Sequence, residues 1–364
     1  MTTVGVLGGG QLGRMLALAG YPLGLKLRFF DHSPEAPAGQ VGELAVSEFD
    51  DLEALDEFAR GVDVVTYEFE NVPVQAVEHL AKTVRVYPPA EALTNSQDRL
   101  SEKRFLRALG IPTASFAPVA SAEELQDAVA EIGFPSILKT RRMGYDGKGQ
   151  CRLSRAEDCG AALAEMQGAP AILEGMVPFE REVSLLTVRS VSGQIEFYPL
   201  IENYHEGGIL RRSIAPAPGI SAGLQQLAQQ YGAAIAERLN YAGVLAVEFF
   251  QLGEQLLVNE MAPRVHNSGH WTIEGATTSQ FENHLRAVLD LPLGITDALG
   301  VSAMLNCIGS TPDRRACLAV PGLHFHTYGK SSREGRKVGH LTICAENEVE
   351  LRKVLPAIER LQSA

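Results

Sequence analysis

The chain opens with an apolar run that leads at once into closely spaced glycines. Residues 4–15 read VGVLGGGQLGRM, in which Gly8, Gly10 and Gly13 spell the pattern G-x-G-x-x-G. Strand-like runs and helical patterns alternate through this part of the chain, at 3–8, 11–24, 25–31, 52–60 and 62–70. Strands joined through helices must lie parallel, because parallel neighbours need a crossover connection. The first 90 residues therefore predict a Rossmann-like α/β domain.

The glycine motif on its own allows two kinds of ligand. Asp31 closes the second strand-like run at about the offset expected for a ribose-binding acid, which favours a dinucleotide and an NAD-dependent oxidoreductase. Backbone amides at a helix N-terminus also suit a single phosphate of a mononucleotide. The motif predicts phosphate binding, and the rest of the chain has to decide the ligand.

The charge balance narrows the range of partners. The 364 residues include 32 Lys and Arg against 44 Asp and Glu, a formal net charge of −12. Nucleic acid and anionic membrane surfaces repel such a chain, so we expect small-molecule substrates, no nucleic acid and no membrane. The 5 cysteines never show C-x-x-C spacing, which disfavours a disulfide framework. No apolar run reaches the ~18 residues of a membrane span, and we expect a cytoplasmic location.

Beyond residue 90 the regular alternation gives way to mixed strands and helices. Two prolines in the run YPPAE (87–91) mark a first boundary. The elements predicted after it are a helix (96–110), a strand (134–140), a glycine-rich basic loop (141–150), strands within 170–190 and 194–218, a helix (221–240), a hairpin (243–263) and a final helix (346–362). The whole chain is therefore predicted to combine α/β and α+β parts.

Two glutamates lie on the strands of the predicted hairpin. Glu248 and Glu260 are on strand-like runs joined through the residues LGE. A three-residue loop containing glycine would pair position 248 with position 260, whereas a two-residue loop would place the side chains on opposite faces. Converging carboxylates repel each other unless a cation lies between them, and Mg²⁺ shared with nucleotide phosphates is the common solution. An ordinary hairpin with two solvent-facing glutamates is the alternative.

A second glycine-rich segment concentrates positive charge in the middle of the chain. Lys139 lies in the strand-like run SILKT, and RRMGYDGKGQ (141–150) follows directly. Amides of such a loop can wrap phosphate oxygens while Lys139 and Lys148 supply charge. The pattern G-x-x-x-x-G-K-[ST] is absent, so this is not a Walker A loop. A mobile surface loop is the alternative.

Two further segments gather polar and basic side chains. The segment APRVHNSGHW (262–271) directly follows the second glutamate. A zinc pair of His266 and His270 is conceivable there, but the intervening Asn-Ser-Gly does not favour the helix that i,i+4 ligation needs, and substrate anchoring fits better. The segment YGKSSREGRKVGH (328–340) is a local positive patch, which suits either phosphate binding or a solvated loop.

The order of these signals resembles the ATP-grasp family over nearly the whole chain. The motifs that carry the resemblance are GGGQLGRM (8–15), KTRRMGYDGKGQ (139–150), NYHEGGILRRSIAPAP (203–218), NEMAPRVHNSGHWT (259–272) and GRKVGH (335–340). They are similar to the N5-carboxyaminoimidazole ribonucleotide synthetase branch, the ATP-dependent carboxylases of purine biosynthesis. The resemblance implies an ATP-grasp fold with a Rossmann-like N-terminal domain (1–95), a small subdomain with a glycine-rich lid (96–180), a large subdomain with the metal site (181–298) and a small β-rich C-terminal domain (299–364).

The resemblance also implies a reaction. ATP would phosphorylate bicarbonate to carboxyphosphate, and the exocyclic amine of 5-aminoimidazole ribonucleotide would capture the activated carbon. The products would be N5-carboxyaminoimidazole ribonucleotide, ADP and phosphate, with Mg²⁺ or Mn²⁺ as the cofactor and a homodimer as the assembly. The opening glycine motif would then hold one phosphate of a mononucleotide substrate. A formate-dependent glycinamide ribonucleotide transformylase, an NAD-dependent oxidoreductase and a non-catalytic nucleotide sensor are the alternatives.

Residue roles follow from positions in the matching motifs. The metal would be held by Glu248 and Glu260, with Asn259 the nearest third candidate, because Ala262 stands where many relatives place a ligating Asn. The residues implied to contact ATP are Arg99, Lys139, Gly144, Tyr145, Asp146, Gly147, Lys148, Gly149, Gln150, Glu174, Gly175, Met176, Val177, Glu182, His205, Asn259 and Glu260. Those implied to hold the ribonucleotide are Gln11, Leu12, Glu68, Lys330, Arg336 and Lys337. Those implied in catalysis are Arg264, His266, Asn267, Tyr145 and Asp146.

Overall fold

The first 90 residues fold as a parallel sheet with helices on both faces, as the alternation predicts. The structure is a computed structural model that describes residues 1–144 and 148–363. Its strand order is β3-β2-β1-β4-β5, and every neighbouring pair is parallel. The strands are β1 (Thr3–Leu7), β2 (Lys26–Asp31), β3 (Glu43–Val46), β4 (Val64–Tyr67) and β5 (Arg85–Val86), and the helices are α1 (Gln11–Gly20), α2 (Leu52–Ala59) and α3 (Val74–Leu80), with short 3-10 turns at Tyr21–Leu23 and Pro37–Gln40.

The buried side chains show why this sheet needs both faces covered. Val4 and Val6 of β1 pack in one core with α1, whereas Leu7 packs in a second core with α2 and α3. All three side chains are fully buried, as expected for a central strand of a parallel sheet.

The predicted helix 11–24 was too long. The α-helix ends at Gly20, and a 3-10 turn over Tyr21–Leu23 follows. Pro22 explains the change, because proline has no amide to donate to the preceding turn and its ring crowds the carbonyl four residues earlier. The predicted helix 96–110 is likewise shorter, since Asp98 caps α5 (Arg99–Ala108) by accepting hydrogen bonds from Leu100 and Ser101.

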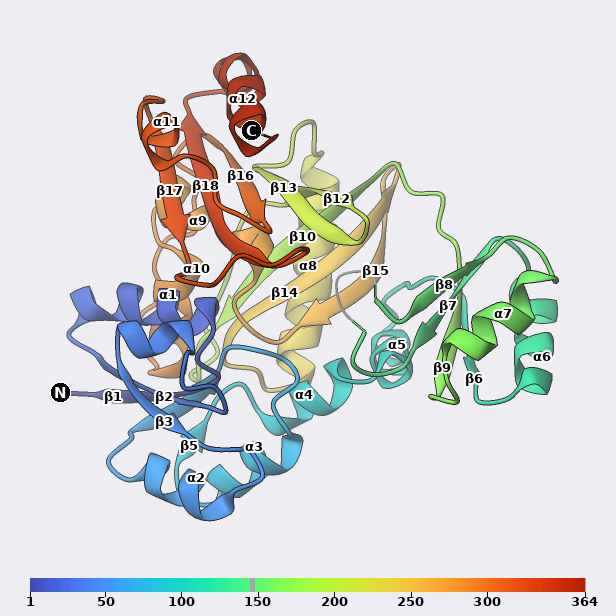
Figure 1. Cartoon of the computed structure of the whole chain (residues 1–364), viewed down its shortest axis with the longest axis horizontal. Helices are drawn as coiled ribbons and strands as arrows, with labels where there is room; N and C mark the ends of the chain where they lie inside the picture. Colours follow the sequence, from blue (N-terminus) through green and yellow to red (C-terminus); the bar gives the residue numbers. More distant parts are fainter. Residues whose placement is uncertain (145–147, 364) are drawn as a thin grey trace.

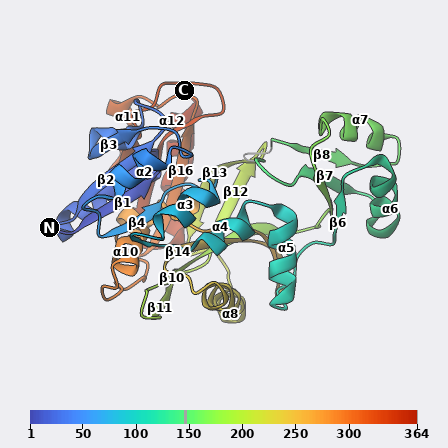
Figure 2. The same cartoon turned by 90° about the horizontal axis from the view of Figure 1, so that it is seen from below.

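An arm projects from the body of the molecule after α4 (Ala90–Ser96) and α5 (Figures 1 and 2). It contains an antiparallel sheet in the order β6-β9-β7-β8, covered by two helices. These elements are β6 (Phe116–Val119), β7 (Ser136–Thr140), β8 (Gln150–Leu153), β9 (Ala171–Gly175), α6 (Ala122–Ile132) and α7 (Asp158–Glu165). The loop between β7 and β8 holds the predicted glycine-rich segment.

The remaining strands form one antiparallel sheet in the order β15-β14-β10-β12-β13-β16-β18-β17, with β11 beside β10. They are β10 (Arg181–Arg189), β11 (Ile195–Phe197), β12 (Ile201–Glu206), β13 (Ile209–Ala215), β14 (Gly243–Leu252), β15 (Gln255–Ala262), β16 (Val301–Ile308), β17 (Leu323–Thr327) and β18 (Lys337–Ala345). The helices around it are α8 (Ala222–Arg238), α9 (Thr272–Gly275), α10 (Gln280–Val288), α11 (Arg314–Leu318) and α12 (Glu348–Ser363), with a 3-10 turn at Asn267–Gly269. The C-terminal strands thus continue this sheet through the pair β13–β16.

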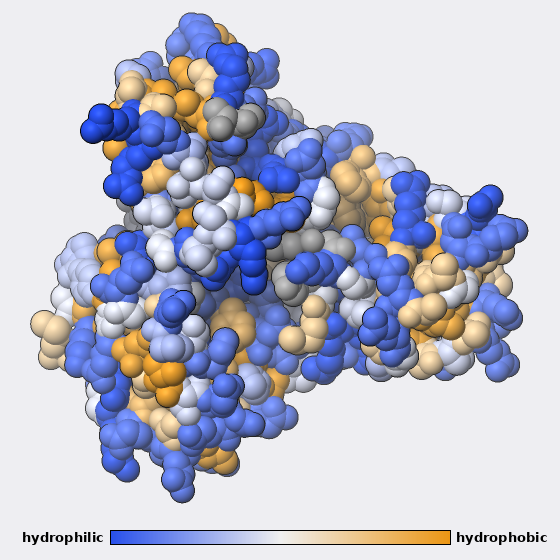
Figure 3. All heavy atoms as spheres, in the orientation of Figure 1, coloured by the Kyte–Doolittle hydropathy of each residue, from blue (hydrophilic) through white to orange (hydrophobic). Residues whose placement is uncertain are grey.

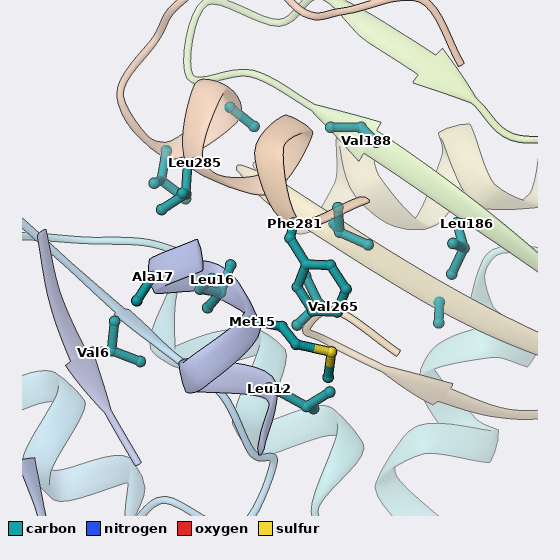
Figure 4. Packing of buried hydrophobic residues seen from close by; sticks show 14 of the residues in the cluster. Val6, Leu12, Met15, Leu16, Ala17, Leu186, Val188, Val265, Phe281 and Leu285 are labelled. Atoms are coloured by element: carbon teal, nitrogen blue, oxygen red, sulfur yellow. The ribbon is translucent and has the colours of Figure 1, made fainter. Parts of the chain in front are cut away.

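A shared core joins the N-terminal sheet to the large antiparallel sheet. Leu12 and Met15 of α1 lie against Phe281 of α10 and Val265, with Leu186 of β10 beyond them (Figure 4). Burying apolar side chains of this size contributes about 1.5–3 kcal/mol each. The core therefore fixes the position of the first glycine loop relative to the strands of the large sheet. Within the described ranges, every helix is too short or too polar to cross a bilayer.

Candidate active site

One cleft of about 620 Å³ collects side chains from all parts of the chain. It lies where the N-terminal sheet, the arm and the large sheet meet, and the surface around the hollow is mostly hydrophilic (Figure 3). The predicted site residues that line it are Gln11, Leu12, Glu68, Arg99, Lys139, Gly144, Lys148, Gln150, Glu182, His205, Glu248, Asn259, Glu260, Arg264, His266, Asn267, Lys330 and Lys337.

A smaller group of predicted site residues is not brought to the cleft lining. Among the described residues these are Gly149, Glu174, Gly175, Met176, Val177 and Arg336. Tyr145, Asp146 and Gly147 lie outside the described residues.

The two glutamates of the hairpin face each other, although the length of the turn alone would have placed them on opposite faces. The turn holds two residues, Gly253 and Glu254, since Leu252 pairs with Gln255. A β-bulge next to the glutamates then shifts the register, so that Glu248 pairs with Glu260. A bulge adds one residue to one strand and so reverses the side of every residue beyond it. The expectation that a two-residue turn would separate the carboxylates was wrong for this reason.

The two carboxylates have different electrostatic surroundings. Glu248 Oε1 lies 3.2 Å from His266 Nε2, and burial together with the charge of Glu260 raises the pKa of Glu248 to about 7. Burial also works against ionisation of Glu260, but Arg99, whose Nη1 lies 3.1 Å from Glu260 Oε2, and then Lys139 hold its pKa below the usual range. Two facing carboxylates can both be ionised when a cation lies between them.

Lys139 meets a buried partner beneath the cleft. Its Nζ donates to Glu174 Oε2 at 2.9 Å, and Lys103 Nζ lies 3.7 Å from the same oxygen. Burial opposes ionisation of Glu174, but Lys139 and Lys103 outweigh it and lower its pKa to about 2. The resemblance implies that Glu174 contacts ATP, and in the structure its carboxylate accepts a hydrogen bond from Lys139, which lines the cleft. Sequence reasoning missed Lys103, whose place one helical turn after Arg99 was the available signal.

The glycine-rich segment of the arm is anchored at its base. Arg141 makes a bidentate pair with the cap residue Asp98, from Nε at 3.1 Å and from Nη2 at 2.8 Å. Arg99 Nη2 donates to the carbonyl of Gly144 at 3.4 Å. The start of α5 therefore contacts both the glycine-rich segment and Glu260. Arg99 and Glu260 are 161 residues apart in the sequence.

Two stacked phenylalanine rings form an aromatic wall of the cleft. The rings of Phe179 and Phe250 stack with centroids 4.7 Å apart and an interplanar angle of 11°. Both rings line the cleft, together with Ile137. Phe250 lies two residues from Glu248 on β14, so the period of 2 along a strand was the signal that could have found it. Sequence analysis did not single out this wall.

Glu182 and His205 meet across neighbouring strands. His205 Nδ1 lies 2.8 Å from Glu182 Oε2. Burial opposes protonation of His205, yet the hydrogen bond to Glu182 and the charge of Glu248 raise its pKa above the usual value. The pair supplies a polar edge to the cleft, next to the aromatic wall.

Protein carboxylates already occupy the amides of the opening glycine motif. Glu68 accepts hydrogen bonds from the amides of Gly10 at 2.8 Å and Gly13 at 3.0 Å. Asp31 accepts from the amide of Gly9 at 2.7 Å and so helps to shape the loop. The amides expected to hold a ligand phosphate therefore bind the protein's own side chains here.

Lysines reach the cleft from the C-terminal segment. Lys330 donates from Nζ to Gln11 Oε1, which joins residues 319 positions apart. Burial lowers the pKa of Lys330, and the carboxylate of Glu68 works against that change. Arg336 instead donates to Ser331 Oγ at 2.9 Å. Of the predicted basic patch, Lys330 and Lys337 line the cleft.

The segment after β15 places three polar side chains at the cleft. Arg264 forms an ion pair with Glu70. A hydrogen bond of 2.8 Å joins His266 Nδ1 and Ser268 Oγ. Asn267 exchanges two amide hydrogen bonds with Asn306, at 2.9 Å and 2.7 Å. Glu70 and Asn306 escaped the sequence analysis because they come from distant segments.

The zinc alternative receives no support from this segment. His266 faces Glu248, whereas the buried ring of His270 packs at 4.8 Å from that of His340. In the parts of the chain that the structure describes, no group of three or more His, Cys, Asp or Glu side chains is arranged to hold a metal by itself.

Comparisons with known proteins match three consecutive segments of the chain. Residues 1–97 match the ribonucleotide synthetase preATP-grasp domain, residues 104–281 the ATP-grasp domain, and residues 302–354 the phosphoribosylaminoimidazole carboxylase C-terminal domain. This order confirms the predicted combination of a parallel N-terminal domain, an ATP-grasp fold and a C-terminal β-rich part.

Several relatives that are similar to the whole chain are named as N5-carboxyaminoimidazole synthases or synthetases. The N5-carboxyaminoimidazole ribonucleotide synthase of Pseudomonas aeruginosa is 51% identical over 363 residues, which covers 99% of each chain. The crystal structure of the corresponding synthetase from Thermus thermophilus has a TM-score of 0.95 at 58% identity and covers 98% of both chains. The synthase from Aspergillus clavatus, in complex with ADP and 5-aminoimidazole ribonucleotide, has a TM-score of 0.92 at 33% identity, over 100% of this chain and 99% of that one.

Proposed function

This chain belongs to the N5-carboxyaminoimidazole ribonucleotide synthase family of ATP-grasp ligases, and from that premise we propose how its cleft catalyses the reaction. The activity is the ATP-dependent carboxylation of 5-aminoimidazole ribonucleotide in purine biosynthesis, through carboxyphosphate. The formate-dependent and NAD-dependent alternatives are set aside, because the whole-chain relatives are named as synthases of this one product.

The facing pair of Glu248 and Glu260, with Arg99 and Lys139 beside it, is the observation that carries the proposal. Phosphoryl transfer needs mainly positioning and neutralisation of charge. A cleft with paired carboxylates and fixed cations beside them supplies both. Neither feature has a role in hydride transfer.

The donor set fits a hard divalent cation. Glu248 and Glu260 are paired across the strands, and His266 contacts Glu248. Among residues 1–144 and 148–363 no three such side chains are arranged to hold a metal by themselves, so phosphate oxygens and water would complete the shell. Glu248 and Glu260 would hold Mg²⁺, or Mn²⁺ in its place, with Asn259 nearby. The bound cation would neutralise charge on the phosphoryl group that is transferred.

ATP is proposed to lie between the arm and the large sheet. Phe179, Phe250 and Ile137 offer a flat apolar wall for a purine base. Glu182, hydrogen-bonded to His205, suits the ribose hydroxyls. The phosphates would meet Arg99, Lys139 and Lys148, and the glycine-rich segment with Gly144, Gly149 and Gln150 would close over them and exclude water.

The chemical steps are those that the family resemblance implies. A bicarbonate oxygen attacks the γ-phosphorus of ATP, its bond to ADP breaks, and carboxyphosphate forms. The amine nitrogen of the ribonucleotide attacks the carboxyl carbon, the carbon–oxygen bond to phosphate breaks, and the amine loses one proton. Arg264, His266 and Asn267 are proposed to steady the bicarbonate-derived oxygens, with Tyr145 and Asp146 near the amine.

The ribonucleotide is proposed to bind beside the N-terminal sheet. Gln11 and Leu12 line the cleft there, and Lys330 and Lys337 bring positive charge to the same place. Glu68 holds the loop that precedes Gln11. These residues, with Arg336 at the edge, would receive the phosphate and ribose of 5-aminoimidazole ribonucleotide.

An omission assay tests the activity. We expect ADP release only when Mg-ATP, bicarbonate and 5-aminoimidazole ribonucleotide are all present, and loss of the signal when any one is left out. A matched series with formate and glycinamide ribonucleotide serves as the control. ADP release in the formate series, or ADP release that does not depend on the ribonucleotide, would contradict the proposal.

Assembly and location are part of the same proposal. We infer a homodimer in the cytoplasm, on the family resemblance and on the small charged substrates that such an enzyme takes. Sedimentation velocity should give twice the mass of one 39.3 kDa chain. A monomer at micromolar concentration that is fully active would contradict the dimer.

A further inference from the structure

Helix α5 contacts three consecutive residues of β15, the strand that contains Glu260. Arg99, at the first position of α5, pairs with the Glu260 carboxylate at 3.1 Å. Lys103 Nζ donates to the backbone carbonyl of Asn259 at 2.7 Å. The backbone amide of Met261 donates to Glu102 Oε1 at 2.7 Å. Side chains of α5 therefore contact Glu260 itself and the backbone on both sides of it.

The contacts fall on the β-bulge that decides where Glu260 points. Val258 pairs with Phe249, and Glu260 pairs with Glu248, so Asn259 is the extra residue of the bulge. Without that extra residue the register would turn the Glu260 side chain to the other face. The facing of the two carboxylates therefore depends on a local backbone distortion.

The outer edge of this strand is covered in two parts. β15 is the first strand in the order of the large sheet, and just before the bulge the segment that leads to β6 pairs with it: Thr113 bridges Val258, whose amide donates to the carbonyl of Pro112 at 2.8 Å. Lys103 and Glu102 satisfy one carbonyl and one amide of this edge. The bulge is thus held between the ladder to β14 and the side chains of α5.

Burial shows that these two residues are more than surface contacts. Glu102 is 2% exposed and Lys103 is 1% exposed. Placing ionisable groups in the interior costs free energy unless they are paired and hydrogen-bonded. Here both side chains are hydrogen-bonded to the backbone of β15 on either side of Glu260, which points to a role in holding that backbone.

We propose that Glu102 and Lys103 are positioning residues that hold the bulge at Asn259 and thereby keep the Glu260 carboxylate opposite Glu248. The inference rests on the proposed function, because it concerns the cation that this carboxylate pair would bind. Removal of either contact would let the edge strand return towards regular pairing and turn Glu260 away. Residues that support metal ligands in this way change metal affinity about 10- to 100-fold when removed.

Binding of Mn²⁺ to the enzyme–ADP complex, measured by electron paramagnetic resonance without turnover, tests the proposal. Lys103→Met and Glu102→Leu should each weaken binding about 10- to 100-fold. Glu102→Gln, which keeps the acceptor for the Met261 amide, should stay within about threefold of the unmodified enzyme. Arg104→Met, on the exposed side of the same helix, is the matched control and should leave affinity unchanged.

A double variant separates positioning from general loss of structure. If Lys103 acts through Glu260, Lys103→Met should add less than about a twofold effect in a Glu260→Gln background. A full additional loss in that background would place the effect elsewhere, for instance on Glu174, and would overturn the proposal. Thermal unfolding of each variant shows whether it folds, and if Lys103→Met does not fold, the Glu102→Leu and Glu102→Gln pair decides.

The possible results distinguish the positioning role of Glu102 and Lys103 from the proposed metal site itself. Equal Mn²⁺ affinity in Lys103→Met, Glu102→Leu and the unmodified enzyme overturns the positioning role and leaves the metal site intact. An unmodified enzyme–ADP complex that binds no Mn²⁺ refutes the metal site itself, and the positioning role with it.

Discussion

The chain has two glycine-rich loops, and the structure fills them in different ways. In the first (8–13), the carboxylate of Glu68 accepts two loop amides, and a Cβ on Gly10 would lie 2.5 Å from Glu68 Oε1. In the second (141–150), Gly144 and Lys148 line the cleft. Gly10, Gln11 and Leu12 of the first loop line the cleft as well, so both loops border it. They differ in that a protein carboxylate accepts two amides of the first loop.

The difference teaches what a glycine pattern does and does not predict. Glycine allows another group to approach the backbone closely, and both loops use that property. The pattern does not say whether the group that approaches belongs to a ligand or to the protein. Glu68 and Asp31 are therefore expected to contribute to stability through the first loop, in addition to the ribonucleotide role proposed for Glu68, and the pair Glu248 and Glu260 is expected to act on chemistry.

The largest effect is expected when one charge is removed from the carboxylate pair of Glu248 and Glu260. Glu260→Gln should lower kcat about a thousandfold, because the cation site contributes several kcal/mol to the transition state. Its melting temperature should stay close to that of the unmodified protein. ADP release and thermal unfolding measure the two effects. Near-normal ATP turnover in this variant would show that Glu260 is not a metal ligand.

Acidification probes the carboxylate beneath the second loop. The pKa of Glu174 is lowered to about 2 in the folded state, against about 4.3 when unfolded. A lowered carboxyl pKa adds stability above the unfolded value, and this stability is lost as pH falls towards 2. Glu174→Gln, which leaves Lys139 and Lys103 without their partner, should cost about 3 kcal/mol at neutral pH.

The pH profile supplies the control for this prediction. Denaturant unfolding at several pH values should show the difference between the unmodified protein and Glu174→Gln narrowing below pH ~4.5. A difference that stays constant down to pH ~2 would mean that the Glu174 charge does not stabilise the fold.

A methyl group tests whether the first loop is filled by the protein itself. Gly10→Ala should destabilise by about 2 kcal/mol, because the new Cβ would press on the Glu68 carboxylate. Gly160→Ala is the matched control, since a Cβ there meets nothing within 4 Å and the residue lies inside α7. The control should be neutral or stabilising by up to about 1 kcal/mol. Equal stability of both variants in denaturant would mean that the first loop has room for a ligand.

The smallest expected effects concern the basic segment near the first loop. Lys330→Ala should raise the KM for the ribonucleotide about tenfold through loss of a charged hydrogen bond. Arg336→Ala should raise it only about twofold, since Arg336 is bound to Ser331 and lies outside the cleft lining. Steady-state kinetics with varied ribonucleotide measure both. An unchanged KM in Arg336→Ala would reject any phosphate role for it, and the reverse order would contradict the placement of Lys330.

Much of the site could be predicted because it follows the chain locally. The strand and loop around Lys139, the hairpin with Glu248 and Glu260, and the polar run from Arg264 to Asn267 are each continuous in sequence. Their chemistry is visible in residue types and spacing. Helix ends were less accurate, since Pro22 and Asp98 act through local hydrogen bonds that a periodic pattern does not record.

Contacts between distant segments were not accessible in this way. Lys103 reaches the carbonyl of Asn259 over 156 residues, and Glu70 pairs with Arg264 over 194 residues. Phe179 comes from a connector and stacks on Phe250 of a strand. No periodicity marks such residues, because their partners are brought together only by the packing of α5 and the arm against the large sheet.

The sequence by itself determined the parallel N-terminal sheet, the family resemblance and the residue types of the site. These follow from hydrophobic periodicity and from motifs that lie within short stretches of chain. Only the tertiary structure decided that Glu68 fills the first glycine loop and that a bulge turns Glu260 towards Glu248. The physical reason is that backbone register and the pairing of buried charges depend on neighbours far away in the chain, whose approach no local pattern encodes.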